Sequence, residues 1–148
     1  MSRKRITVDQ VIEVMDAVVD GYPDGSDVRV GRSSGLGGRY VEHGEPCCLV
    51  GVMLVRFGAS VATLKDLDRE DEDITGSSHP YWKRFDPVAL DLLSFLQRRN
   101  DSGSSWEQAR REAFTANSYW KQRIKPGEAL YQERVFPGRW CNDTNVRH

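Results

Sequence analysis

The stretch that most constrains the fold runs from Gly44 to Gly58 and reads GEPCCLVGVMLVRFG. Between its proline and its last glycine it holds a single charged residue, Arg56. A helix that is apolar on every side is stable only when it is buried. The stretch therefore predicts a buried central helix over residues 46–57, with Pro46 at its first position and Gly58 ending it.

Gly51 falls inside this predicted helix. Glycine in a helix interior costs about 1 kcal/mol relative to alanine, because its backbone loses more conformational freedom. A glycine at a buried helical position indicates that there is no room for a side chain. We therefore expect the backbone of another segment to approach the helix closely at Gly51.

Capping residues and apolar periodicity predict four further helices. Thr7 and Gln10 form a capping box in front of apolar residues that recur at spacings of three and four. Ser60 and Ser104 have the same role before two other helices, and Asp86 precedes a proline at the start of a fourth. The predicted helices cover residues 8–20, 61–68, 87–100 and 106–114.

Two alternating stretches, DVRVGR and RYVEHG, predict a small β-hairpin over residues 28–43. Periodicity fades after Ser118, so residues 118–148 are predicted to form an irregular tail rich in aromatic side chains. A length of 148 residues suits a single domain. We expect a mainly α (α+β) domain, a compact bundle of about five helices around the buried central helix, with residues 1–117 as its core.

Charge and cysteine content exclude several classes of protein. A net charge of -1 gives no general attraction to nucleic acid or to anionic membranes. No run of apolar residues reaches the roughly 18 that a membrane-spanning helix needs. Three cysteines, two of them adjacent, do not fit a disulfide framework and predict a reducing, cytoplasmic location.

The adjacent cysteines allow two interpretations. As a nucleophile, Cys47 or Cys48 would use the helix N-terminus to lower its pKa, with His79 as base and Asp86 orienting that histidine. That order suits a cysteine-dependent hydrolase or transferase, but no familiar nucleophile motif flanks either cysteine. Free cysteine is among the most buried residue types. We therefore favour packing and retain catalysis as the alternative.

A metal or cofactor site is disfavoured by spacing. The residues His43, Cys47, Cys48 and His79 are possible zinc ligands, but paired cysteine ligands are usually two to four residues apart. Adjacent cysteines on a helix point about 100° away from each other. The glycine-rich GRSSGLGG lacks the lysine of a phosphate-binding loop. We expect no metal and no cofactor.

The tail combines aromatic and basic side chains in the proportions found at the centres of protein interfaces. The predicted partner-binding residues are Trp120, Tyr131, Arg134, Phe136, Arg139 and Trp140. The acidic run over residues 66–73 is complementary in charge, so a second copy of the chain is a possible partner. Stacking on single-stranded nucleic acid is an alternative use of the same residues, which we favour less than protein contact.

Two motifs carry a resemblance to known proteins. GGRYVEHGEPCCLVGVMLVRFG reads as a strand, a turn and a Cys-Leu-Val-Gly helix, and ALDLLSFLQRRNDSGSSWEQARREA as a helix, a break and a helix that starts with Ser-Trp. From Arg39 to Ala113 the chain resembles small uncharacterised proteins of actinobacterial phages and their hosts. It departs from them at Cys48, because their pattern has one cysteine. The resemblance implies a non-enzymatic cytoplasmic protein that binds a host or phage protein, and it supplies no catalytic residues.

Overall fold

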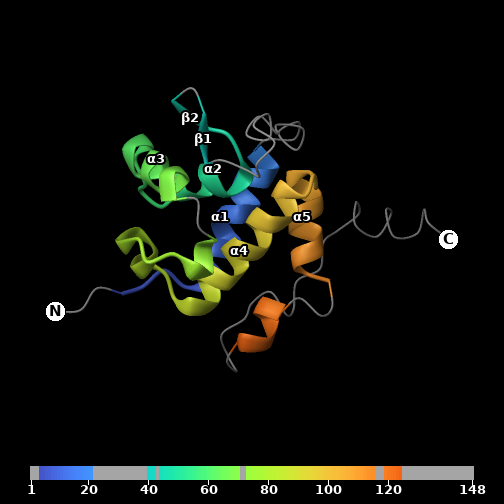
Figure 1. The fold of residues 1–148 in the computed structure, drawn as a ribbon. Coiled ribbons are helices and arrows are strands. Elements are labelled where there is room, and N and C mark those ends of the chain that lie inside the picture. The colour runs from blue at the N-terminus through green and yellow to red at the C-terminus, as the bar shows by residue number, and fades with distance from the viewer. Residues whose placement is uncertain (1–3, 22–39, 43, 71–72, 116–118, 125–148) are drawn as a thin grey trace.

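The computed structural model describes residues 4–21, 40–42, 44–70, 73–115 and 119–124 (Figure 1). The described residues contain five α-helices, which are α1 (Val8–Gly21), α2 (Leu49–Arg56), α3 (Val61–Glu70), α4 (Pro87–Asp101) and α5 (Trp106–Ala113). Two short strands, β1 (Val41–Glu42) and β2 (Glu45–Pro46), form a small sheet. Three 3-10 helices complete the described elements: η3 (Ile74–Gly76), η4 (Pro80–Arg84) and η5 (Tyr119–Arg123). The predicted mainly helical fold is confirmed.

Two helices share the centre of the molecule. The side chains of α2 from Leu49 to Leu54 are buried, as the apolar run predicted. Helix α4 packs against α1, α2, α5, η3 and η5, while α3 lies to one side, next to the two strands (Figure 1). One continuous apolar cluster joins these elements, and its largest fully buried side chains include Trp106, Trp120 and Phe85.

Helix α2 begins three residues later than predicted. Pro46 lies in β2, opposite Val41, where its missing N–H is no loss at the edge of a two-stranded sheet. The backbone N–H of Cys47 donates to the carbonyl oxygen of Tyr40 at 3.1 Å, so it continues the strand pairing. The helix starts only after Cys48, and Gly58, with a φ of 95°, follows its end as predicted.

Only one of the two strands of the predicted hairpin lies within the described residues. The strand expected near residue 41 exists, as β1. Its antiparallel partner among the described residues is β2, reached through a turn at Gly44, whose φ is 80°. The expected partner strand around residues 28–31 lies outside the described residues.

Gly51 lies against the backbone of the segment that leads into β1. A Cβ atom placed on Gly51 would be 2.4 Å from the carbonyl oxygen of Tyr40. Side-chain atoms essentially never come this close to another atom, and the Tyr40 carbonyl has little freedom to move because it accepts the Cys47 N–H. The close backbone approach expected at this glycine is confirmed.

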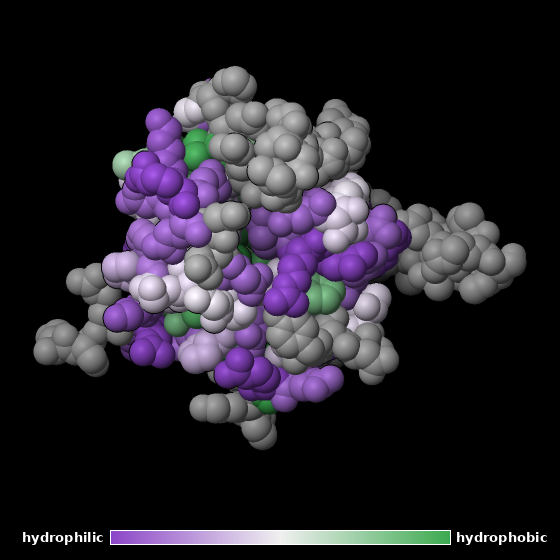
Figure 2. Space-filling model, in the orientation of Figure 1, coloured by the Kyte–Doolittle hydropathy of each residue, from purple (hydrophilic) through white to green (hydrophobic). Residues whose placement is uncertain are grey.

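The surface is mostly polar on the face that Figure 2 shows, with small and scattered apolar areas. Within the described ranges, Val55 is the exposed large hydrophobic residue, at 40% of its surface. None of the helices in those ranges combines the length and the apolar character that crossing a bilayer requires.

The contact at Gly51 makes a prediction about stability. Replacing glycine by alanine inside a helix normally raises the free energy of unfolding by about 1 kcal/mol. At Gly51 the new Cβ would push Tyr40 away, and overpacking of this kind lowers the free energy of unfolding by about 1–3 kcal/mol. We expect the urea midpoint of Gly51→Ala to fall. The matched control is Gly21→Ala at the last residue of α1, where a Cβ meets nothing within 4 Å, and its midpoint should stay or rise. Equal midpoints for the two variants would contradict the close approach.

Candidate functional site

Cys48 is the N-cap of α2. Its sulfur accepts a hydrogen bond from the backbone N–H of Gly51 at 3.3 Å, as a serine or aspartate oxygen does at most helix starts. Its thiol donates to the Oε1 atom of Gln97 on α4 at 3.7 Å. Cys48 and its neighbour Cys47 are 5% and 4% exposed. The sequence placed both cysteines inside the helix, and the structure places them at and just before its start.

Burial dominates the electrostatics of the Cys48 thiol. Removal from water raises the pKa of this thiol well above its ordinary value, and the Gly51 N–H opposes the shift more weakly. A helix N-terminus lowers a thiol pKa only where the charged form is not heavily penalised by burial. The thiolate that nucleophilic catalysis requires is therefore scarce at neutral pH.

Polar side chains near the end of α4 hold the start of α2. The backbone N–H of Leu49 donates to Oδ1 of Asn100 at 3.2 Å, and the Asn100 amide donates to the carbonyl of Ser104 at 3.0 Å. Gln97 faces Cys48 with its oxygen and donates with its nitrogen to Asp101 at 2.9 Å. None of these residues belongs to a motif that the sequence predicts to be functional. The sequence feature that could have indicated them is a pair of polar residues, Gln97 and Asn100, about one turn apart on a largely buried helix.

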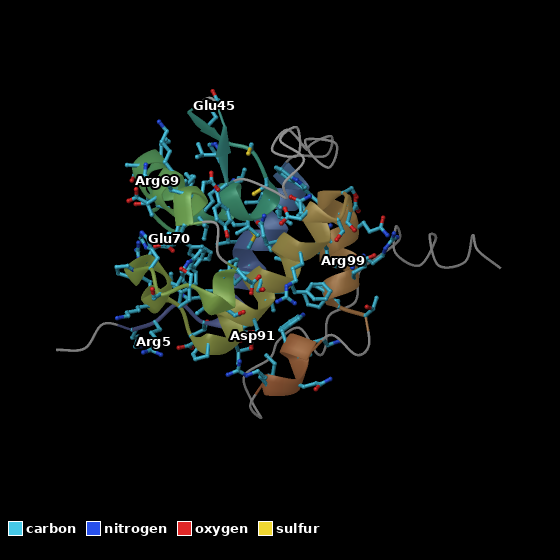
Figure 3. All side chains as sticks on the ribbon, viewed as in Figure 1. Arg5, Glu45, Arg69, Glu70, Asp91 and Arg99 are labelled. Atoms are coloured by element: carbon cyan, nitrogen blue, oxygen red, sulfur yellow. The ribbon has the colours of Figure 1, made fainter. Side chains whose placement is uncertain are left out.

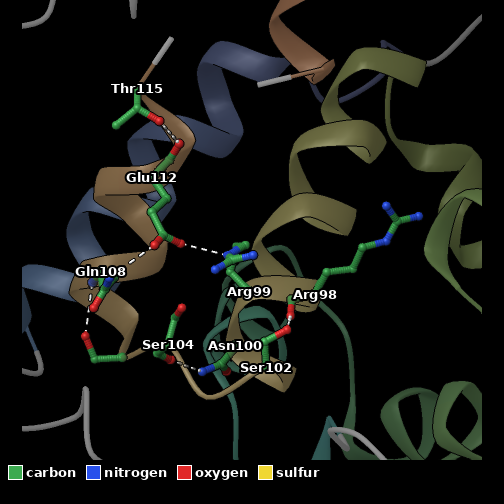
Figure 4. Close-up of polar contacts among 9 residues, drawn as sticks. Arg98, Arg99, Asn100, Ser102, Ser104, Gln108, Glu112 and Thr115 are labelled. Atoms are coloured by element: carbon green, nitrogen blue, oxygen red, sulfur yellow. Dashed lines mark hydrogen bonds and ion pairs between the residues drawn. The ribbon is translucent and has the colours of Figure 1, made fainter. Parts of the chain in front are cut away.

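A second polar cluster fixes α5 against α4 (Figure 4). Glu112 accepts from Nε of Arg99 at 2.7 Å and from the side-chain amide of Gln108 at 3.1 Å. The cap of α5 is Ser105 and not Ser104 as predicted, because the Ser105 hydroxyl accepts from the backbone N–H of Gln108 at 3.1 Å. These contacts stabilise the helix pair that supports Asn100.

His79 caps the 3-10 helix η4. Its Nδ1 accepts from the backbone N–H of Tyr81 at 3.0 Å. In the neutral imidazole the proton is then on Nε2, so neither nitrogen has a free lone pair for a general base. The ring lies at an open hollow of about 400 Å³ lined by Asp66, Arg69, Glu70 and His79. Figure 3 shows Arg69 and Glu70 of this group on α3.

Hydrogen bonds do not link Cys48 to the other residues of the catalytic alternative. The hydrogen bonds of Cys48 go to Gly51 and Gln97, and those of His79 go to its own segment. Asp86 precedes α4 as predicted, but its side chain makes no capping bond. Across the described ranges, no hydrogen bond joins Cys48, His79 and Asp86. The same ranges contain no group of three or more His, Cys, Asp or Glu side chains placed to hold a metal ion.

Trp120 corrects part of the predicted partner surface. Its side chain is 0% exposed, and its ring contacts that of Phe114 edge-on with the centroids 6.3 Å apart. A fully buried ring cannot contact a partner, so Trp120 belongs to the core. The other predicted partner-binding residues lie outside the described residues: Tyr131, Arg134, Phe136, Arg139 and Trp140.

An ion pair holds η5 onto α4. Arg123 donates to Oδ2 of Asp91 at 2.6 Å, and the Asp91 side chain is 5% exposed (Figure 3). Burial raises the pKa of the Asp91 carboxyl, while Arg123 acts in the opposite direction. Lys121 adds hydrogen bonds to the carbonyls of Phe114 and Thr115, at 3.4 and 3.0 Å. The chain is therefore attached to the helical body as far as Ile124, which is partly buried.

Comparison with known proteins adds one partial similarity. No family model matches the chain, and no solved structure matches it. The chain is similar to glycogen synthase of Cellvibrio japonicus (strain Ueda107), with 31% identity over 134 residues. That alignment covers 74% of this chain and 27% of the other protein. The chain thus spans about a quarter of the length of the curated relative it matches.

The capping role of Cys48 predicts slow thiol chemistry. At pH 7 the native protein should react with a thiol reagent at Cys47 and Cys48 at least about tenfold more slowly than the urea-unfolded protein, because labelling requires local opening. Mass spectrometry after timed labelling measures the modified fraction of each cysteine. Cys141 serves as an internal reference, expected to label faster than both. Rapid native labelling of Cys48 that persists below pH 7 would restore the nucleophile interpretation.

The Arg123–Asp91 pair predicts a pH-dependent loss of stability. Arg123→Gln removes this ion pair from a buried carboxylate, and a hydrogen bond to a charged group contributes about 1.5–3 kcal/mol. Loss of the arginine raises the folded-state pKa of Asp91 further, so the native state gains affinity for a proton relative to the unfolded state. The destabilisation of Arg123→Gln should thus be largest near neutral pH and shrink as pH falls towards 4. Chemical unfolding at several pH values measures it.

The control for this experiment is Asp91→Asn/Arg123→Gln, which removes both charges. Its stability should vary less with pH than that of Arg123→Gln. A pH-independent effect of Arg123→Gln would show that the arginine acts through packing and not through Asp91.

Proposed function

We propose that this chain is a non-enzymatic protein that acts in the cytoplasm by binding another protein. The observation that carries the proposal is the role of Cys48, whose sulfur caps α2 within the core and whose pKa is raised. Cys48, which the sequence offers as a candidate nucleophile, thus stabilises the start of α2. Cys47 and Cys48 are both free thiols, which suits a reducing compartment.

The C-terminal segment is the proposed contact surface. Trp120 and Arg123 attach the chain to α4, so the residues after Ile124 start from a defined point on a folded body. The sequence beyond that point carries Tyr131, Phe136 and Trp140 among basic residues. Tyr, Trp and Arg are the side chains that most often dominate binding energy at protein interfaces.

The resemblance to phage proteins suggests the class of partner. On that basis we propose that the chain is encoded by a phage or its host and that the partner is a host or phage protein. A second copy of this chain is the alternative partner, through the acidic run at residues 66–73.

The test compares full-length variants in affinity capture from an actinobacterial lysate, followed by titration of the purified partner. The test variant is Tyr131→Ala/Phe136→Ala/Trp140→Ala, and the control is Val55→Ala, which removes apolar surface from the exposed side of α2. Truncating an interface hot spot costs about 2 kcal/mol or more, so the triple variant should bind at least about 30-fold more weakly. The control should bind like the wild type.

Two results would contradict the proposal. In one, the triple variant binds the captured partner as tightly as the wild type. In the other, its urea midpoint falls well below that of the wild type, which would place these aromatic side chains in the core.

A further inference from the structure

A bridge between two distant segments brings four basic residues together. The backbone N–H of Ile6 donates to the carbonyl of Arg84 at 2.7 Å, and the N–H of Asp86 donates to the carbonyl of Ile6 at 2.8 Å. These bonds make a parallel bridge between Ile6 and Phe85. The residues that precede the bridge on its two sides are all basic and exposed, and we call them the basic ridge: Lys4, Arg5, Lys83 and Arg84.

The bridge makes the backbones of two basic segments neighbours. In a parallel pair, the residues just before the bridged ones are also neighbours, and adjacent backbones lie about 4.8 Å apart. The bond from the Ile6 N–H to the Arg84 carbonyl therefore places the backbones of Arg5 and Arg84 side by side. Figure 3 shows Arg5 at the outside of the molecule, well apart from Arg69 and Glu70 of α3. The two segments thus bring four exposed basic residues to one part of the surface.

The ridge has no acidic partner within the described residues. The ion pairs there use other arginines, such as Arg98, Arg99 and Arg110, and none reaches a ridge residue. Arg84 instead lies over the ring of Tyr81, with its guanidinium carbon 5.1 Å from the ring centroid. The Tyr81 hydroxyl donates to the carbonyl of Leu54 at 3.3 Å, so the ring is a fixed platform.

A guanidinium on such a platform is pre-organised for an incoming anion. Its planar fork matches a carboxylate with two parallel hydrogen bonds, and holding it in place reduces the entropy lost on binding.

We propose that the basic ridge is a docking surface for an acidic segment of a partner protein, whose carboxylates pair with Arg5 and Arg84. The inference rests on the proposed role in protein binding, but it uses residues other than the C-terminal segment. A short acidic peptide fits this surface better than nucleic acid does. The ridge is local, the net charge is -1, and the acidic run at residues 66–73 would repel a long polyanion.

The experiment measures fluorescence anisotropy of a fluorescein-labelled octaglutamate peptide titrated with the full-length protein at low and physiological salt. Arg5→Gln/Arg84→Gln removes the paired guanidiniums. Lys65→Gln/Arg69→Gln removes the same charge from exposed positions on α3 and is the matched control. We expect the ridge variant to bind at least about tenfold more weakly and the control to stay within about twofold, with binding that weakens as salt rises.

Three outcomes would overturn the proposal. The wild type shows no binding at low salt, the two double variants weaken binding equally, or an eight-nucleotide single-stranded DNA binds the wild type more tightly than the peptide does. Unchanged circular dichroism of the ridge variant verifies that it is folded. Trp140→Ala should bind the peptide like the wild type, so failure of the C-terminal segment as a contact would not affect this result.

Discussion

The structure depends on how the start of α2 is held between a strand and a helix. On one side Gly51 touches the carbonyl of Tyr40, at a distance that leaves no room for a Cβ atom. On the other side Asn100 of α4 binds the backbone N–H of Leu49. The N–H groups at a helix start need partners when they are buried, because water cannot reach them. Tyr40, Cys48 and Asn100 supply those partners, and α2 can then be apolar on all sides.

This arrangement decides what the cysteines can do. A thiol at a helix start is often reactive, because the N–H groups and the helix dipole stabilise its anion. Here Cys48 has that position, yet the penalty for placing a negative charge in the core is the larger effect, and its pKa rises. The Cys48 thiol therefore has a structural role, as the cap of α2.

The sequence predicted the elements that depend on local signals. The capping box at Thr7 and Gln10 is present, with bonds of 2.9 and 3.2 Å, and the apolar stripe behind it is buried. The close approach at Gly51 followed from the cost of a glycine in a buried helix. Thr7 and Gln10 are only three positions apart, so their contact can be predicted from local sequence. The contact at Gly51 can be predicted because the residue type alone indicates that a side chain does not fit.

The features that the sequence did not predict depend on distant partners. The Cys48 thiol donates to Gln97, and the Leu49 N–H at the start of α2 donates to Asn100. Both partners are about fifty residues away in the chain. Trp120 carries no periodic signal, and its contact with Phe114 and the nearby Asp91 pair place it in the core. The sequence also did not predict the basic ridge, because the bridge between Ile6 and Phe85 brings its two halves together.

Native-state hydrogen exchange of the backbone amides of Leu49 and Gly51 tests this account most directly. The Leu49 amide donates to Asn100 of α4, and the Gly51 amide donates to the buried Cys48 sulfur, whose thiol in turn contacts Gln97 of α4. Both amides are buried where α2 meets α4, so they should exchange only through global unfolding. The account predicts opening free energies for Leu49 and Gly51 equal to those of the most protected amides in α4. Exchange at free energies far below those of α4, with the rest of the core still protected, would show that the start of α2 opens independently and would contradict it.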